Sequence, residues 1–485
     1  MNPYSLLRLP YLLLITCSLL LTSACNKKQQ PNFLVCMADD WGWPHAGEYG
    51  DPVVKTPSFD RLANEGILFE HAYVSSPSCT PSRNAVLTGQ YHWRLEEGAN
   101  LHSTLDVNVP VYPLLLEDAG YYIGRWRKCW GPGKLEAGGY TDRNPGGKNF
   151  EGFEDFIANR PEGKPFCFWL GSSDPHRGYK LNSGLESGMD LSKIHVPDFY
   201  PDVELIRSDI ADYYWEVQRF DRDCGEAIAL LEEIGEFENT LIIMTGDHGM
   251  PFPRCKSNLY DWGTRVPLAI RWGKEISPDR TVKDFVSFTD FAPTILDLAG
   301  LDIPESMSGR SLFKIFSSDK TGWIIKNRDH VIFGKERHVP AQAAPSTAGY
   351  PCRSIRTEKW QYIYNFEPDR WPVGVPEGAS HPMNNFADTD GGPSKFYLMT
   401  LKDDPDMKKY YDWSYAKRPQ EELYDMENDP YQLKNIADQR DYADVKKELK
   451  EQLFEELKIS QDPRVIGGGE KFDSYPYRAG YELRK

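Results

Sequence analysis

Residues 32–40 have the sequence NFLVCMADD, and they are the best starting point for predicting the fold of this 485-residue chain. The apolar run over residues 32–38 is typical of a fully buried strand. It ends in two adjacent acids, Asp39 and Asp40, and Gly42 follows. Open α/β sheets bind their ligands beyond the carboxyl ends of their strands. Asp39 and Asp40 are therefore candidate ligand-binding residues.

Helical and strand patterns alternate along the chain after this run. Residues 57–69 have helical spacing, with Phe59, Leu62, Ala63 and Ile67 on one face. Further helices are expected over 84–89, 111–120, 209–234 and 290–298, and strands from 121, over 166–171 and over 240–245. This alternation predicts an α/β fold with a parallel or mostly parallel sheet covered by helices on both faces.

The pattern changes beyond about residue 340. Residues 354–366 alternate like paired antiparallel strands, and residues 442–458 have the spacing of a charged amphipathic helix. We therefore expect a main domain over residues 32–340 and a smaller C-terminal α+β domain over residues 341–485.

The N-terminus has the features of an export signal. Arg8 precedes an apolar stretch over residues 11–21, which is shorter than the ~20 residues that span a bilayer. Residues 21–25 (LTSAC) resemble a bacterial lipoprotein signal with Cys25 as the lipid-bearing residue; ordinary signal-peptide cleavage nearby is the alternative. We expect a signal peptide over 1–24, a tether over 25–31, and export to the periplasm or the outer-membrane surface, with a lipid anchor on Cys25.

Charge and cysteine usage exclude some classes of partner and structure. The formal net charge of −16 argues against nucleic acid as a partner. The nine cysteines show no close paired spacing, so neither a disulfide framework nor a zinc ribbon is indicated. Cys36 and Cys167 lie in apolar runs and are expected to be buried. Cys79 lies in a polar stretch, expected to be a turn, and needs another explanation.

That explanation comes from residues 79–89, CTPSRNAVLTG. They resemble the Cys-x-Pro-x-Arg signature, with its trailing Leu-Thr-Gly, of the type I sulfatases in the alkaline phosphatase superfamily. The resemblance implies an alkaline-phosphatase-like fold and oxidation of Cys79 to formylglycine (3-oxoalanine) by a formylglycine-generating maturation enzyme. One hydroxyl of the hydrated aldehyde would attack sulfur, and the other would help to expel sulfate. Pro81 restricts the backbone, and Arg83 supplies a permanent positive charge beside the nucleophile.

The order of the acidic residues along the chain agrees with this resemblance. The family's metal site uses two acids after the first strand and an Asp-Asn or Asp-His pair after a later one. Asp39 and Asp40 match the first pair, and Asp247 and His248 match the second, with Cys79 beside them. Hard oxygen ligands imply Ca²⁺, with Mg²⁺ as the alternative, rather than zinc.

Three further residues match positions that contact sulfate in the family. Lys256 stands where relatives have a basic residue on the sulfate oxygens, and His176 matches the His that protonates the leaving group. Lys128 aligns with the Lys of a Lys-x-His pair, and together these residues would stabilise the transition state. The chain departs from the pattern at Trp130, which replaces the His of that pair, so the group that assists sulfate release is open.

Two stretches resemble the heparan N-sulfatase (sulfamidase) branch, which includes bacterial enzymes acting on algal polysaccharides such as ulvan. They are residues 174–177 (DPHR) and residues 251–260, from PFP to NLY. The expected substrate is a sulfated oligosaccharide, with O-sulfate against N-sulfate left open. A phosphonate or phosphodiester hydrolase of the same superfamily is one rival prediction, and a non-catalytic glycan-binding lipoprotein is the other.

Overall fold

A central sheet of eight strands forms the middle of the computed structural model, which describes residues 29–484. The expected signal peptide and Cys25 lie outside the described residues. The strand order is β5-β4-β6-β1-β7-β8-β2-β9, and β8 runs antiparallel to both of its neighbours while the other pairs are parallel. The prediction of a mixed, mostly parallel sheet is confirmed. The strands are β1 (Asn32–Ala38), β2 (Ile67–Phe69), β4 (Tyr122–Arg127), β5 (Lys148–Asn149), β6 (Phe166–Gly171), β7 (Thr240–Gly246), β8 (Leu268–Arg271) and β9 (Arg280–Val282).

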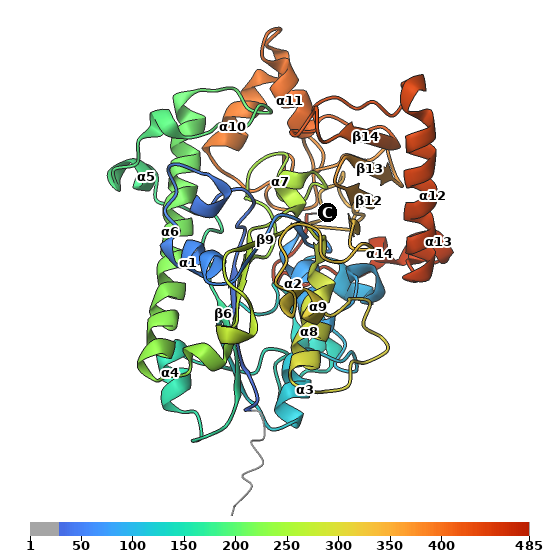
Figure 1. The fold of residues 1–485 in the computed structure, drawn as a ribbon. Helices are drawn as coiled ribbons and strands as arrows, with labels where there is room; N and C mark the ends of the chain where they lie inside the picture. The colour runs from blue at the N-terminus through green and yellow to red at the C-terminus, as the bar shows by residue number, and fades with distance from the viewer. Residues whose placement is uncertain (1–28, 485) are drawn as a thin grey trace, which may run out of the picture.

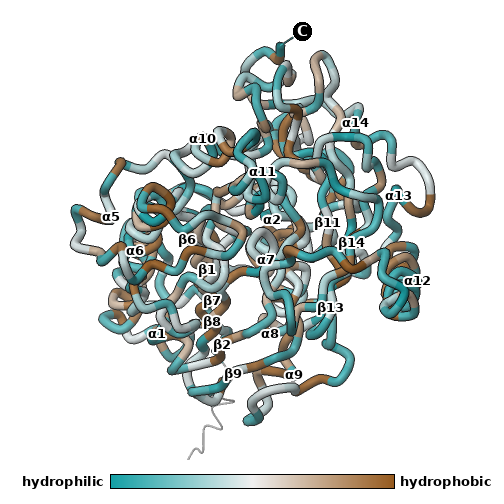
Figure 2. The backbone as a smooth tube through the Cα atoms, turned by 90° about the horizontal axis from the view of Figure 1, so that it is seen from above, coloured by the Kyte–Doolittle hydropathy of each residue, from teal (hydrophilic) through white to brown (hydrophobic). Residues whose placement is uncertain are grey.

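Strand β1 is buried on both faces because its side chains alternate between two cores. Leu34, Cys36 and Ala38 pack in one core with α1 (Pro57–Asn64), α4 (Phe153–Ala158) and α6 (Glu204–Glu233). Phe33 and Met37 pack in the other, with α2 (Cys79–Thr88), α3 (Tyr112–Asp118) and α8 (Phe291–Leu298). The two groups of helices lie on opposite sides of the sheet (Figure 1), and in the view from above the strands run between α1 and α8 (Figure 2).

A second, antiparallel sheet of four strands has the order β11-β12-β13-β14. Its strands are β11 (His330–Lys335), β12 (Cys352–Thr357), β13 (Trp360–Asn365) and β14 (Glu421–Asp425). Helix α12 (Ala443–Ile459) covers one face through Leu449, Leu453 and Leu457. The other face packs against residues of the main domain, including Tyr73 and Phe285. The C-terminal α+β unit is confirmed, but its sheet begins at His330, inside the range predicted for the main domain.

The remaining strands and α-helices are short. They are β3 (Ala72–Tyr73), which pairs with β10 (Val286–Ser287), and helices α5 (Ser183–Glu186), α7 (Asp261–Thr264), α9 (Phe313–Phe316), α10 (Pro393–Thr400), α11 (Lys408–Tyr415), α13 (Pro463–Ile466) and α14 (Lys471–Ser474). No helix among residues 29–484 has both the length and the apolar character needed to cross a bilayer.

Three predicted helix boundaries were wrong. The long helix expected over 209–234 begins earlier, at Glu204, and the other two errors have identifiable reasons. The helix expected over 57–69 ends at Asn64, and Ile67 starts β2, which pairs with β8. Gly66 allows this close approach, since a Cβ there would lie 2.2 Å from the Ile270 carbonyl oxygen. The helix expected over 84–89 begins at Cys79 instead. Pro81 is compatible with that start because backbone N–H groups in the first turn have no partner within the helix.

A buried ion pair joins the small sheet to the C-terminal helices. Arg353 donates to both carboxylate oxygens of Asp462, at 2.6 and 3.0 Å, and to Glu336 at 2.7 Å. All three side chains are at most 1% exposed. Removing one partner of a buried pair leaves an uncompensated charge.

We therefore expect Asp462→Asn to lower the free energy of unfolding by about 3 kcal/mol or more. Urea denaturation followed by circular dichroism measures this change. Glu451→Gln is the control, because its pair with Lys447 lies on the surface, where such pairs contribute little. Equal midpoints for the two variants would contradict the prediction.

Candidate active site

The two acidic pairs predicted from the sequence meet at one edge of the central sheet. Strands β1 and β7 are parallel neighbours, and Ala38 is paired with Gly246 at their carboxyl ends. The residues that follow them are therefore adjacent, and the backbone N–H of Asp40 donates to Asp247 Oδ1 at 2.8 Å. His248 Nε2 lies 3.1 Å from Asp40 Oδ1. Sequence positions about 200 residues apart thus form one buried cluster.

Cys79 is the first residue of α2 and points into this cluster. Its Sγ lies 3.6 Å from Asp39 Oδ1 and 3.3 Å from His248 Nε2, and the side chain is buried. Burial raises the pKa of the Cys79 thiol well above its ordinary value. Without a metal ion, burial therefore disfavours the thiolate, which is the nucleophilic form of an unmodified cysteine. The helix N-terminus beside it favours negative charge, as a sulfate group would bring.

Arg83 lies one turn further along α2, and its hydrogen bonds link Asp247 to the segment that carries Lys128. Its Nε donates to Asp247 Oδ2 at 2.8 Å, and its Nη1 donates to the Lys128 carbonyl oxygen at 2.6 Å. Lys128 Nζ in turn donates to both oxygens of Asp39, at 2.5 and 2.7 Å. Burial alone would raise the pKa of Asp39, but Lys128, His176 and Arg83 hold that pKa well below its ordinary value. Asp39 is therefore ionised.

Lys256 and His176 complete the positions inferred from the family resemblance. Lys256 Nζ donates to Asp40 Oδ2 at 2.8 Å and to Asp390 Oδ2 at 2.9 Å. His176 Nε2 lies 4.0 Å from Asp40 Oδ2, while Nδ1 is within hydrogen-bonding distance of the Arg177 carbonyl oxygen. The His176 side chain is 37% exposed, whereas that of Lys256 is 3% exposed. His176 is thus on the solvent side of the cluster, where a leaving group would be.

The acids around residue 79 suit a divalent cation. Potential ligand atoms of Asp40, Cys79 and His248 lie within 4.8 Å of one another. The same holds for Asp39, Cys79 and Asp247. Asp40 Oδ1 is buried and accepts no hydrogen bond from the described residues, and His248 Nε2 lies 3.1 Å from it, so both atoms could bind one ion. Carboxylate oxygens are the donors that Ca²⁺ and Mg²⁺ prefer, which fits the predicted site.

Trp130 occupies the position at which the family pattern has a histidine. Its indole Nε1 donates to Asn84 Oδ1 at 2.7 Å, on helix α2. The Trp130 ring packs against the second core of the main domain. Trp130 therefore supports α2 and has no group that could exchange a proton with a substrate.

Other polar residues at the site were not predicted from the sequence. His338 follows β11 and its Nδ1 lies 2.8 Å from Ser78 Oγ, next to the nucleophile. Lys335 donates to Asp388 at 3.0 Å, and Asp390 accepts from Lys256. They come from two segments, residues 335–338 (KERH) and 388–392 (DTDGG), whose composition is that of ordinary surface loops. No periodicity distinguishes them.

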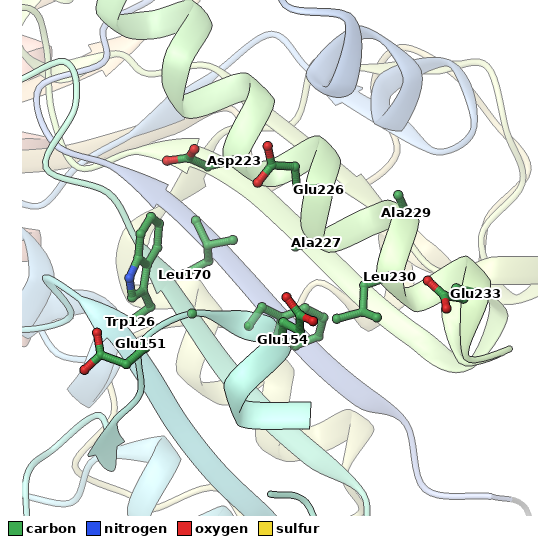
Figure 3. A pocket seen from close by; sticks show the side chains of 12 residues that line it. Trp126, Glu151, Glu154, Leu170, Asp223, Glu226, Ala227, Ala229, Leu230 and Glu233 are labelled. Carbon is green, nitrogen blue, oxygen red and sulfur yellow. The ribbon is translucent and has the colours of Figure 1, made fainter. Parts of the chain in front are cut away.

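A hollow of about 520 Å³ lies elsewhere, between β4, α4 and α6. Figure 3 shows Trp126 and Glu151 together on one side, Glu154 on α4, and Asp223, Glu226 and Glu233 along α6. These carboxylates would repel a sulfated ligand, and none of the residues that line the hollow belongs to the cluster around Cys79. The hollow is therefore not a site for the sulfated group.

Two known family models match parts of this chain. The family model described as sulfatase matches residues 31–147 and 147–301, which is more than half of the chain. The chain belongs to the sulfatase family. It is therefore a hydrolase of sulfate esters, and its family generally uses formylglycine and a divalent metal. A second model, described as N-sulphoglucosamine sulphohydrolase, C-terminal, matches residues 246–390.

Individual relatives cover nearly the whole sulfatase chain. Human N-sulphoglucosamine sulphohydrolase is 28% identical over 505 residues, covering 93% of this chain and 94% of its own. An ulvan-active sulfatase of Formosa agariphila is 26% identical and covers 88% and 74%. A structure solved with its substrate, D-glucosamine-2-N,6-O-disulfate, has a TM-score of 0.64 at 20% identity and covers 89% and 98%. This structural similarity shows a shared fold.

Proposed function

We propose that this sulfatase removes sulfate from a sulfated carbohydrate and uses formylglycine derived from Cys79 as its nucleophile. The observation that carries the proposal is the environment of Cys79. It begins a buried helix and lies within 3.6 Å of Asp39 and His248, and the neighbouring acids Asp247, Asp39 and Asp40 are paired with the cations Arg83, Lys128 and Lys256. A glycan-binding scaffold without activity would not need this arrangement of acids and cations around one buried side chain.

Each residue of the site has its own role in the proposed hydrolysis. Hydrated formylglycine supplies two hydroxyl groups on one carbon, one to attack sulfur and one to let sulfate depart. Lys128 and Lys256 hold the sulfate oxygens, and their charge stabilises the transition state. His176 delivers a proton to the leaving oxygen or nitrogen. Asp39, Asp40, Asp247 and His248, with residue 79, would hold the Ca²⁺ or Mg²⁺ ion, which supplies Lewis-acid polarisation of the sulfate.

The substrate class follows from the relatives. One is named for N-sulphoglucosamine and another for ulvan. A sulfated glycosaminoglycan or algal polysaccharide fragment is therefore the proposed substrate. A sulfamate of glucosamine is the second candidate, because the C-terminal model of N-sulphoglucosamine sulphohydrolase matches residues 246–390.

The test uses protein produced together with a formylglycine-generating enzyme. Release of inorganic sulfate is measured from N-sulfoglucosamine, N-acetylglucosamine 6-sulfate, ulvan oligosaccharides and 4-nitrophenyl sulfate, with 4-nitrophenyl phosphate and a phenylphosphonate ester as comparisons. We expect turnover of at least one sulfated sugar. Turnover of the phosphorus esters alone would overturn the proposal in favour of a phosphonate or phosphodiester hydrolase.

We also propose export as a lipoprotein, on the basis of residues 1–25. Metabolic labelling with a radioactive fatty acid in a bacterial host should label the wild-type chain and leave Cys25→Ala unlabelled. Equal labelling of both, or labelling of neither, would count against a lipid on Cys25.

A further inference from the structure

Asp390 contributes a partly exposed carboxylate to a site whose other acids are buried. The side chains of Asp39, Asp40 and Asp247 are 5% exposed or less, whereas that of Asp390 is 25% exposed. Its Oδ2 accepts a hydrogen bond from Lys256, which also holds Asp40. Asp390 therefore lies at the rim of the anion site, linked to its centre through one lysine.

The open side of Asp390 is close to the expected position of the leaving group. One ring nitrogen of His176 and one carboxylate oxygen each of Asp40 and Asp390 all lie within 4.8 Å of one another. Because His176 is the proposed proton donor to the leaving atom, the sugar carbon that carries the sulfate must come near it. The neighbouring carbons of the sugar are then within reach of Asp390.

A shared anchor holds His176 and Asp390 in their relative positions. Arg177, next to His176, makes a two-pronged ion pair with Asp209 at 2.7 and 2.9 Å. Asp209 also accepts from the backbone and the hydroxyl group of Ser394, at the start of α10. A Cβ at Gly392 would lie 2.4 Å from Arg177 Nη1, so a larger residue there would push the guanidinium group away from Asp209. Asp390 therefore lies two residues before Gly392, which packs against the Arg177–Asp209 pair. These contacts fix the backbone near Asp390, whereas the backbone beside an ordinary surface acid is not fixed in this way.

The charge of Asp390 decides what it can bind. A carboxylate repels the sulfate group itself and can only accept hydrogen bonds. Lys256 satisfies Oδ2, and no hydrogen bond to Oδ1 is found among the described residues. We infer that Asp390 Oδ1 accepts a hydrogen bond from the hydroxyl or amino group of the sugar that lies nearest to the sulfated position. The inference rests on the proposed function and makes Asp390 a specificity-determining residue for sugars over simple sulfate esters.

The test compares a sugar substrate with one that has no neighbouring donor. The kcat/KM of matured enzyme is measured on 4-nitrophenyl sulfate and on whichever of N-sulfoglucosamine and N-acetylglucosamine 6-sulfate the wild type hydrolyses. Asp390→Asn should reduce kcat/KM on the sugar by about 10- to 100-fold, as expected for loss of a hydrogen bond to a charged group. On the aryl ester the same variant should stay within about threefold of wild type, because an asparagine carbonyl oxygen can still accept from Lys256 and no hydrogen bond to the substrate is lost there. Asp406→Asn, an exposed acid of the same region, is the control and should change neither value.

The ratio of the two kcat/KM values is the readout, because incomplete folding or maturation lowers both values equally. Asp390→Ser provides a second variant that must show the same change in ratio. An unchanged ratio, whether both activities fall or neither does, would overturn the inference and leave Asp390 as a support for Lys256. A wild type inactive on every sulfate ester would instead refute the proposed function.

Discussion

Cys79→Ser will give a folded protein that releases sulfate at least about 10³-fold more slowly than the matured wild type. Serine matches cysteine in size, so packing at the start of α2 should be preserved. It carries a single hydroxyl, however, and cannot form the geminal diol that lets sulfate depart. Steady-state sulfate release, with mass spectrometry of the peptide containing residue 79, measures both the loss of activity and the modification that it removes.

Cys352→Ser is the matched control for this substitution. Cys352 is also buried, and its Sγ already lies 3.7 Å from the Tyr350 carbonyl oxygen, so a serine hydroxyl would find an acceptor there. Its activity should stay close to that of the wild type. Unmodified Cys79 in an active enzyme, together with full activity of Cys79→Ser, would refute the formylglycine mechanism.

Removal of divalent ions should have the next largest effect. Exhaustive dialysis against EDTA is expected to lower kcat/KM by about 10²-fold or more, since a Lewis acid contributes several kcal/mol to transition-state stabilisation. It should also lower the melting temperature, because an ion that binds only the folded protein stabilises it and this contribution would be lost. Binding at 1,000 times the dissociation constant stabilises a folded protein by about 4 kcal/mol. Added Ca²⁺ should restore both quantities.

Asp40→Asn separates metal binding from a general effect of the chelator. It removes one charge from the proposed ligands while keeping the shape of the side chain. Its melting temperature should respond much less to EDTA or Ca²⁺ than that of the wild type. If metal analysis shows that the wild-type protein is free of divalent ions and its activity and melting temperature are unchanged, the metal assignment is wrong.

Much of the scaffold could be predicted because it depends on local patterns. The apolar runs of β1 and β7 and the helical spacing of α6 give periodicities that are visible in the sequence. Acids placed directly after two buried parallel strands meet whenever those strands are neighbours, and β1 and β7 are. Asp39, Asp40, Asp247 and His248 therefore form a cluster, as expected. Their roles and those of Cys79, Arg83, Lys128, His176 and Lys256 stay predictions until the variants are measured.

Boundaries were less predictable than elements. The end of α1 at Asn64 depends on the pairing of β2 with β8, which is distant in the sequence, and α2 begins at Cys79 because its first turn accommodates Pro81. Likewise, β11 belongs to the C-terminal sheet because it pairs with β12, although it precedes the predicted domain boundary. The sequence around residue 330 gives no sign of which strand it will pair with.

By itself, the sequence determined the α/β architecture, the position of the reactive cysteine and the family to which the chain belongs. These depend on residue periodicity and on a contiguous motif, both of which are local. Only the tertiary structure decided that His338 and Asp390 lie at the site, and that the indole N–H of Trp130 donates a hydrogen bond to Asn84. Loop residues have no periodic pattern, and Asp390 reaches Lys256 across 134 positions because Arg177, Asp209 and Ser394 pack together in the folded chain.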